Sequence, residues 1–155
     1  MDSINIFPHG LSLGQGTFRP AMIFKDKQQS EVLPVWLNNY ESNILLSSAQ
    51  SSVGESTPHK ASLKIFESFG ITLESIYFNE VTNSIQYAEV TAAQGNKKVK
   101  SRVLASEAMS LALNAGCVFL TNKEVIEASR VLNFQMVLHE GQVGAGAAND
   151  PGILH

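Results

Sequence analysis

Cysteine, charge and long hydrophobic runs are all scarce in this chain of 155 residues. The single cysteine, Cys117, excludes an intrachain disulfide framework and a cysteine-based zinc cluster. The apolar stretches are short, such as residues 117–120, whereas a membrane-spanning helix needs about 20 apolar residues. Residues 1–5 also lack the basic and apolar regions of a secretory signal. We therefore expect a cytoplasmic protein without a membrane segment.

Charged residues make up only 16% of the chain, and they are mostly acidic. Eleven Lys and Arg residues oppose fourteen Asp and Glu residues, for a net charge of −3. This balance excludes a generally basic nucleic-acid binder but leaves room for a local basic patch. So little charge also indicates that part of the surface is covered by another subunit.

The hydrophobic content of 44% is enough for the core of one domain. Strand-like runs and helix-like segments alternate along the chain, and Pro34 marks the third run as an edge strand or a bulged one. The order predicts a single compact α+β domain over residues 1–139, with a mixed, largely antiparallel sheet and about four helices. The glycine- and alanine-rich residues 140–155 predict a flexible tail. The predicted strands are 3–7, 17–24, 31–37, 71–78, 85–91, 99–104 and 117–120, and the predicted helices are 38–50, 57–69, 107–115 and 123–130.

Polar residues stand at the predicted helix starts. Asn38, Thr57, Ser106 and Asn122 are all suited to cap a helix. A helix N-terminus also attracts anions, so several converging ends could hold a phosphate; ordinary capping is the alternative.

The second predicted helix has apolar residues on one side. Leu63, Phe66 and Phe69 recur at a spacing of three, which predicts that they face the core. Gly70 follows where a left-handed helix end is expected.

Most catalytic signatures are absent, including a phosphate-binding loop, a nucleophile elbow and a His-Glu-x-x-His zinc helix. Three residues remain as candidates for chemistry: Glu41, His59 and Glu107. Two carboxylates and a histidine can hold a divalent cation such as Mg²⁺ or Mn²⁺ for phosphodiester hydrolysis. The alternatives are a capping role for Glu41, a favourable first-turn charge for Glu107 and a solvent-facing His59.

Residues 97–102 form the one basic cluster of the sequence. In a strand, Lys98, Lys100 and Arg102 would share one face. This stripe suits contacts with a phosphate backbone in DNA or RNA, and it also suits an edge strand protected by lysines.

Three segments together resemble the bifunctional nuclease (BFN) domain family, over about residues 4–132. Val-Leu-Pro-Val-Trp-Leu-Asn-Asn-Tyr-Glu at 32–41 resembles the family's Val-Leu-Pro-Ile-Trp-Ile-Gly-x-x-Glu-Ala. His59, with Gly70 eleven positions later, is similar to its Thr-His-Asp helix start and closing Leu-Gly. Residues 106–120, beginning Ser-Glu-Ala-Met-Ser-Leu-Ala-Leu, are similar to its Ser-Asp-Ala-Ile-Ala-Leu-Ala-Leu segment.

The resemblance implies an α+β domain that forms homo-oligomers, either dimers or trimers, and that cuts DNA and RNA. Position by position, it implies Glu41, His59, Ser106 and Glu107 as the catalytic candidates. A non-catalytic structural or regulatory oligomer, and an anion- or nucleic-acid-binding module without chemistry, are the alternatives.

The chain departs from the family pattern at positions that matter for this chemistry. Lys60 and Arg102 each replace an Asp, Leu104-Ala105 replaces Arg-Pro, and Glu107 replaces an Asp. Two carboxylates and an arginine are therefore missing, which weakens any metal site, while Lys60 adds attraction for a phosphate.

Overall fold

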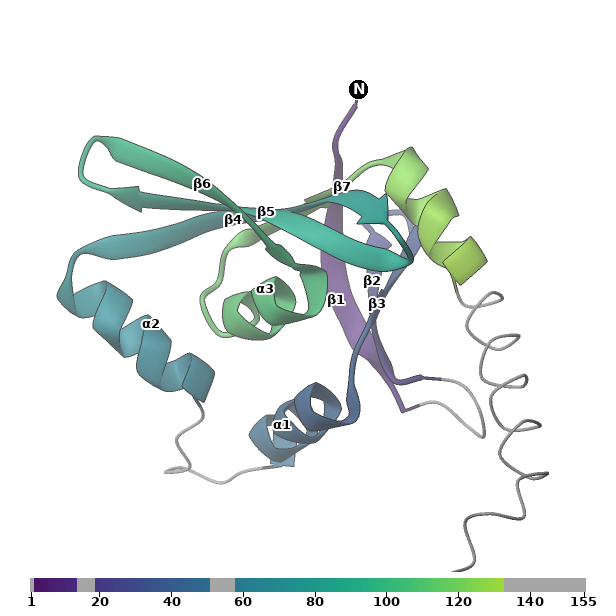
Figure 1. Ribbon diagram of the computed structural model, residues 1–155, viewed down its shortest axis with the longest axis horizontal. Helices are drawn as coiled ribbons and strands as arrows, with labels where there is room; N and C mark the ends of the chain where they lie inside the picture. Colours follow the sequence, from purple (N-terminus) through teal and green to yellow (C-terminus); the bar gives the residue numbers. More distant parts are fainter. Residues whose placement is uncertain (1, 14–18, 51–57, 133–155) are drawn as a thin grey trace, which may run out of the picture.

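The computed structural model describes residues 2–13, 19–50 and 58–132, which form a single α+β domain (Figure 1). The strands are β1 (Ile4–Ser12), β2 (Ala21–Asp26), β3 (Val32–Trp36), β4 (Ile71–Thr82), β5 (Ile85–Gln94), β6 (Lys97–Leu104) and β7 (Val118–Thr121). The helices are α1 (Asn39–Gln50), α2 (Pro58–Ser68), α3 (Ala105–Ala112) and a fourth over residues 123–132. The predicted fold class is confirmed, whereas the predicted tail, 140–155, lies outside the described residues.

One sheet runs through the whole domain in the order β3-β2-β1-β7-β4-β5-β6. Its described neighbours pair antiparallel, except that β4 and β7 run parallel. The edge position of β3 confirms the interpretation of Pro34, since proline has no N–H to donate to a further strand. The other edge is β6, which carries the basic stripe.

The strands β1, β4, β5 and β6 are longer than predicted, and the largest extensions are in β1 and β4. The sequence predicts that the first strand ends at residue 7, but β1 continues through Pro8-His9-Gly10 with a bulge between Pro8 and Gly10. β4 continues to Thr82, and the turn into β5 shrinks to Asn83 and Ser84, with φ of 52° and 63°. Positive φ at both residues is typical of a two-residue hairpin turn that matches the twist of its strands.

The core lies between the sheet and α3. Three aromatic rings meet there: Phe24 lies 5.4 Å from Phe78 and 5.0 Å from Phe119, measured between ring centroids. α3 adds Met109, which is fully buried, and small residues that allow the helix to approach the strands closely. Figure 1 shows α3 directly under the sheet, with α2 to its left and α1 below it.

The helix starts follow the predictions only in part. Asn38 and Asn122 both act as caps, because each Oδ1 accepts the backbone N–H three residues later, at 2.7 and 2.9 Å. The prediction for Ser106 is wrong: α3 begins at Ala105, and its cap residue Leu104 makes no side-chain capping bond. Thr57 lies outside the described residues.

The prediction that α2 packs into the core is also wrong. No residue of α2 is buried. Leu63 and Phe66 are half-buried, and Phe69, directly after the helix, is 66% exposed. The physical reason is position: α2 contacts α3 and β4 at the margin of the domain, where little covers its apolar side.

The sequence predicts a protein without a membrane segment. Among the residues described, no helix is long and apolar enough to cross a membrane.

Candidate functional site

The first turns of α2 and α3 open onto a common cavity of about 570 Å³, which we call the α2–α3 groove. His59 comes from the first turn of α2 and Glu107 from the first turn of α3. Most of the wall is apolar and is contributed by α2, α3 and the strands β4, β5 and β6. Its side chains include Phe66, Leu73, Val90, Val103 and Leu111. The fold thus brings one imidazole and one carboxylate to the mouth of an otherwise hydrophobic groove.

Glu41 does not line this groove. It lies in the first turn of α1, is only 6% exposed, and its Oε2 is buried without a hydrogen-bond partner. The other candidate carboxylate, Glu107, is exposed. The three candidates therefore do not share one site: His59 and Glu107 line the groove, whereas Glu41 is buried in α1.

The separation of Glu41 from His59 and Glu107 affects whether these residues can bind a metal ion together. Within residues 2–13, 19–50 and 58–132, no three His, Cys, Asp or Glu side chains come together as a metal-binding group. The described donors therefore do not fit a zinc ion, which needs three protein ligands in a catalytic site and four in a structural one. We therefore assign no chemical step to a metal.

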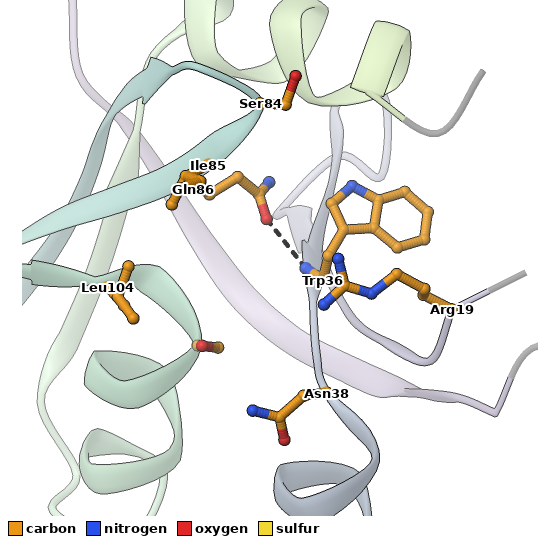
Figure 2. A pocket seen from close by; sticks show the side chains of 8 residues that line it. Arg19, Trp36, Asn38, Ser84, Ile85, Gln86 and Leu104 are labelled. Carbon is orange, nitrogen blue, oxygen red and sulfur yellow. Dashed lines mark hydrogen bonds between the residues drawn. The ribbon is translucent and has the colours of Figure 1, made fainter. Parts of the chain in front are cut away.

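Ser106 lines a second, smaller cavity of about 250 Å³, which we call the Trp36 cavity (Figure 2). Asn38, Arg19, Trp36 and Gln86 also line it, together with Ser84, Ile85 and Leu104. The consecutive residues Ser106 and Glu107 of α3 therefore face different cavities. The N-terminal turn of this helix separates a polar cavity from an apolar groove.

Gln86 lines the Trp36 cavity and is 8% exposed. Its Oε1 accepts the backbone N–H of Trp36 at 2.9 Å, the bond drawn in Figure 2. Its Nε2 donates to the carbonyl oxygen of Pro34 at 2.7 Å and to Oγ of Ser129 at 2.8 Å. One side chain thus ties β5 to the edge strand β3 and to the fourth helix.

The basic stripe lies on the opposite face of the sheet from the α2–α3 groove. Ser101 and Val103 line the groove, and alternation along the regular strand β6 puts Lys98, Lys100 and Arg102 on the other face. Each basic residue has an acidic partner across the sheet. The pairs are Lys98–Glu74 at 2.9 Å, Lys100–Glu89 at 2.8 Å and Arg102–Glu80 at 2.7 Å. The local charge of the stripe is therefore largely balanced.

Arg102 is the most firmly held member of the stripe. Its Nε and one terminal nitrogen donate to the two carboxylate oxygens of Glu80, and its guanidinium lies 3.6 Å from the centre of the Tyr87 ring. Hydrogen bonding from Arg102 lowers the pKa of Glu80 to about 2, with a further contribution from the Thr82 hydroxyl. A phosphate would have to compete with this bidentate partner for Arg102.

Sequence reasoning passed over three residues of the Trp36 cavity: Arg19, Trp36 and Gln86. Trp36 stands within the quoted Pro-Val-Trp-Leu-Asn segment, two residues before the Asn38 cap, so its neighbourhood was signalled. Arg19 and Gln86 lie far from it in the chain, and no local pattern marks them.

Lys60 is half-buried beside His59 on α2.

The model of the bifunctional nuclease domain matches residues 22–133, which is most of the chain and includes both cavities' helices. A comparison with curated proteins finds no match. The match begins at residue 22, later than the resemblance from residue 4 suggests, and it includes His59, Ser106 and Glu107. The chain belongs to the bifunctional nuclease domain family.

Proposed function

We propose that this chain hydrolyses phosphodiester bonds of DNA or RNA in the α2–α3 groove. The observation that carries the proposal is the position of His59 and Glu107, which are 48 residues apart in sequence yet line one cavity. Membership of the bifunctional nuclease domain family supplies the substrate class.

In this proposal His59 accepts a proton from the attacking water as the water oxygen bonds to phosphorus. Histidine suits this role because its ordinary pKa lies near neutral pH. The ester P–O bond then breaks, and the leaving oxygen takes up the proton from the His59 imidazolium, which returns the imidazole to its neutral form. Glu107 stabilises the imidazolium formed at His59 through its negative charge on the same groove.

The surroundings of the groove predict slow turnover and weak substrate binding. Its wall is mainly apolar, and the basic stripe that could attract a polyanion lies on the other face of the sheet. The net charge of −3 adds a small repulsion for nucleic acid at long range. A flexible single strand is therefore a better substrate than a duplex, because one phosphodiester can enter the groove alone.

The test is cleavage of end-labelled DNA and RNA strands by highly purified protein, with Mg²⁺, with Mn²⁺ and with a chelator. The variants are His59→Ala, Glu107→Gln and the corresponding double variant. His9→Ala is the matched control, because His9 is exposed on β1 and outside the groove. The proposal expects activity in the wild type and the control and its loss in the double variant. Equal activity in the double variant rejects these residues as the site.

A non-catalytic, self-associating protein is the second candidate, and the exposed apolar side of α2 favours it. Ile65 is 57% exposed, Phe69 is 66% exposed, and no residue of α2 is buried. An amphipathic helix normally buries its apolar side, so another copy of the chain would be its natural cover. A dimer or trimer formed through α2 fits this candidate.

Light scattering during size-exclusion chromatography tests this association. Phe69→Ser should lower the molar mass toward that of a monomer, whereas Phe7→Ser, which changes another exposed phenylalanine on β1, should not. A monomeric wild type at all concentrations would exclude self-association. Cleavage that depends on His59 would exclude the non-catalytic candidate.

A further inference from the structure

We propose that the Trp36 cavity binds a phosphate group, either inorganic phosphate or the monoester phosphate of a nucleotide. This site is distinct from the α2–α3 groove and does not depend on hydrolysis there. Three side chains carry the inference: Arg19, Asn38 and Ser106, which come from three separate segments and line one small cavity.

Arg19 supplies the positive charge. Its guanidinium carries five N–H donors in a planar fork, so a contact made by some of them leaves others for a ligand. Figure 2 shows the Arg19 head group beside Trp36, above Asn38. Arginine is the side chain best suited to hold phosphate oxygens through paired hydrogen bonds.

Asn38 supplies a directed amide. Its Oδ1 already accepts the backbone N–H of Glu41 at 2.7 Å. The same bond fixes the amide so that Nδ2, with its two N–H groups, points away from that turn, as Figure 2 shows. Capping of α1 therefore orients the donor that the cavity uses.

Ser106 adds a hydroxyl from the first turn of α3, whose N-terminus lacks a side-chain cap. The acceptor side of the cavity is occupied, because Oε1 of Gln86 accepts the backbone N–H of Trp36. No Asp or Glu is found among the described residues that line the cavity. A guanidinium together with amide and hydroxyl donors suits an anion and disfavours a cation.

The size of the cavity limits the ligand. About 250 Å³ accepts a phosphate and part of the group attached to it, but not a nucleic-acid duplex. The chain contains one tryptophan, and that residue lines the site. Binding should therefore change the intrinsic fluorescence of the protein.

The experiment titrates the full-length protein with inorganic phosphate while Trp36 fluorescence is recorded. Isothermal titration calorimetry then compares inorganic phosphate, a nucleoside 5′-monophosphate, the parent nucleoside and acetate. Arg19→Gln and Ser106→Ala are the site variants. Lys27→Gln is the control, because it removes the same charge from an exposed residue of the β2–β3 turn. Circular dichroism melting verifies that each variant is folded.

We expect saturable phosphate binding that is weakened about tenfold or more by Arg19→Gln and about fivefold by Ser106→Ala, and is unchanged by Lys27→Gln. Equal affinity for phosphate and the monophosphate identifies free phosphate as the ligand, and tighter binding of the monophosphate identifies a nucleotide. No binding of either, equal binding of acetate, or full binding by both folded site variants overturns the proposal.

Discussion

Gln86 offers the sharpest test of how this fold holds its edge. The edge strand β3 has β2 on one side, and on the other side Gln86 takes the place of a further strand. Its amide bonds the N–H of Trp36 and the carbonyl of Pro34, and it also reaches the buried hydroxyl of Ser129. We therefore expect Gln86→Ala to loosen β3 from both β5 and the fourth helix.

The structure sets the magnitude of that loss. Three hydrogen bonds are removed, at about 1 kcal/mol each. Ser129 is fully buried, so leaving its hydroxyl without this donor costs about 1 kcal/mol more. The free energy of unfolding should fall by about 4 kcal/mol, which lowers Tm by about 8–16 °C for a chain of this size.

Urea unfolding followed by far-ultraviolet circular dichroism measures this change without relying on Trp36, which lies beside the mutation. Gln28→Ala is the control, because Gln28 is exposed in the β2–β3 turn. A loss below about 1 kcal/mol for Gln86→Ala, comparable to the control, would refute the reasoning, since ordinary net hydrogen bonding alone predicts more.

Three further outcomes follow from the same structure. The Glu80 carboxylate should titrate near pH 2 by NMR, and Arg102→Gln should raise its pKa toward 4.5. Because the pKa of Glu80 is depressed in the folded state, the contribution of the Glu80–Arg102 pair to stability is present above pH 4.5 and is lost as the pH falls toward 2. In Phe69→Ser, thermal stability of a dilute sample should change little, since the side chain is 66% exposed, while self-association measured by ultracentrifugation should weaken. Adding Leu104→Arg to Arg19→Gln should restore phosphate binding in calorimetry, because both positions line the Trp36 cavity.

The order and type of the elements could be predicted because they depend on local signals. Pro34 marks an edge strand through its missing N–H, and Asn38 and Asn122 begin helices through short-range bonds to the residue three positions on. The α+β class follows from that order. Strand lengths were less accessible, because a bulge at Pro8–Gly10 and a two-residue turn at Asn83–Ser84 are settled by pairing with the neighbouring strand.

The candidate site depended on long-range geometry, which local patterns do not contain. The sequence shows the apolar side of α2 but does not show which element covers it. The prediction that Phe69 faces the core is therefore wrong, because this side chain is exposed. The basic stripe was visible too, whereas its partners on β4 and β5 depend on sheet register. His59 and Glu107 begin different helices, and only the packing of α2 beside α3 brings them to one groove.

The departures from the family pattern have different consequences once they are placed in the fold. Arg102, in place of an Asp, is held by Glu80 on the face away from the groove, so it neither supplies nor removes a group at either cavity. Leu104 stands where the pattern has an arginine, and it lines the Trp36 cavity that Arg19 also lines. The positive charge at that cavity is therefore supplied from the segment before β2. In the proposed phosphate site, Arg19 takes the place of the arginine that the family pattern has at position 104, whereas no described lining residue of the α2–α3 groove replaces the carboxylate that the pattern has beside His59. We therefore expect phosphate binding to persist in this chain even where the proposed hydrolysis is slow.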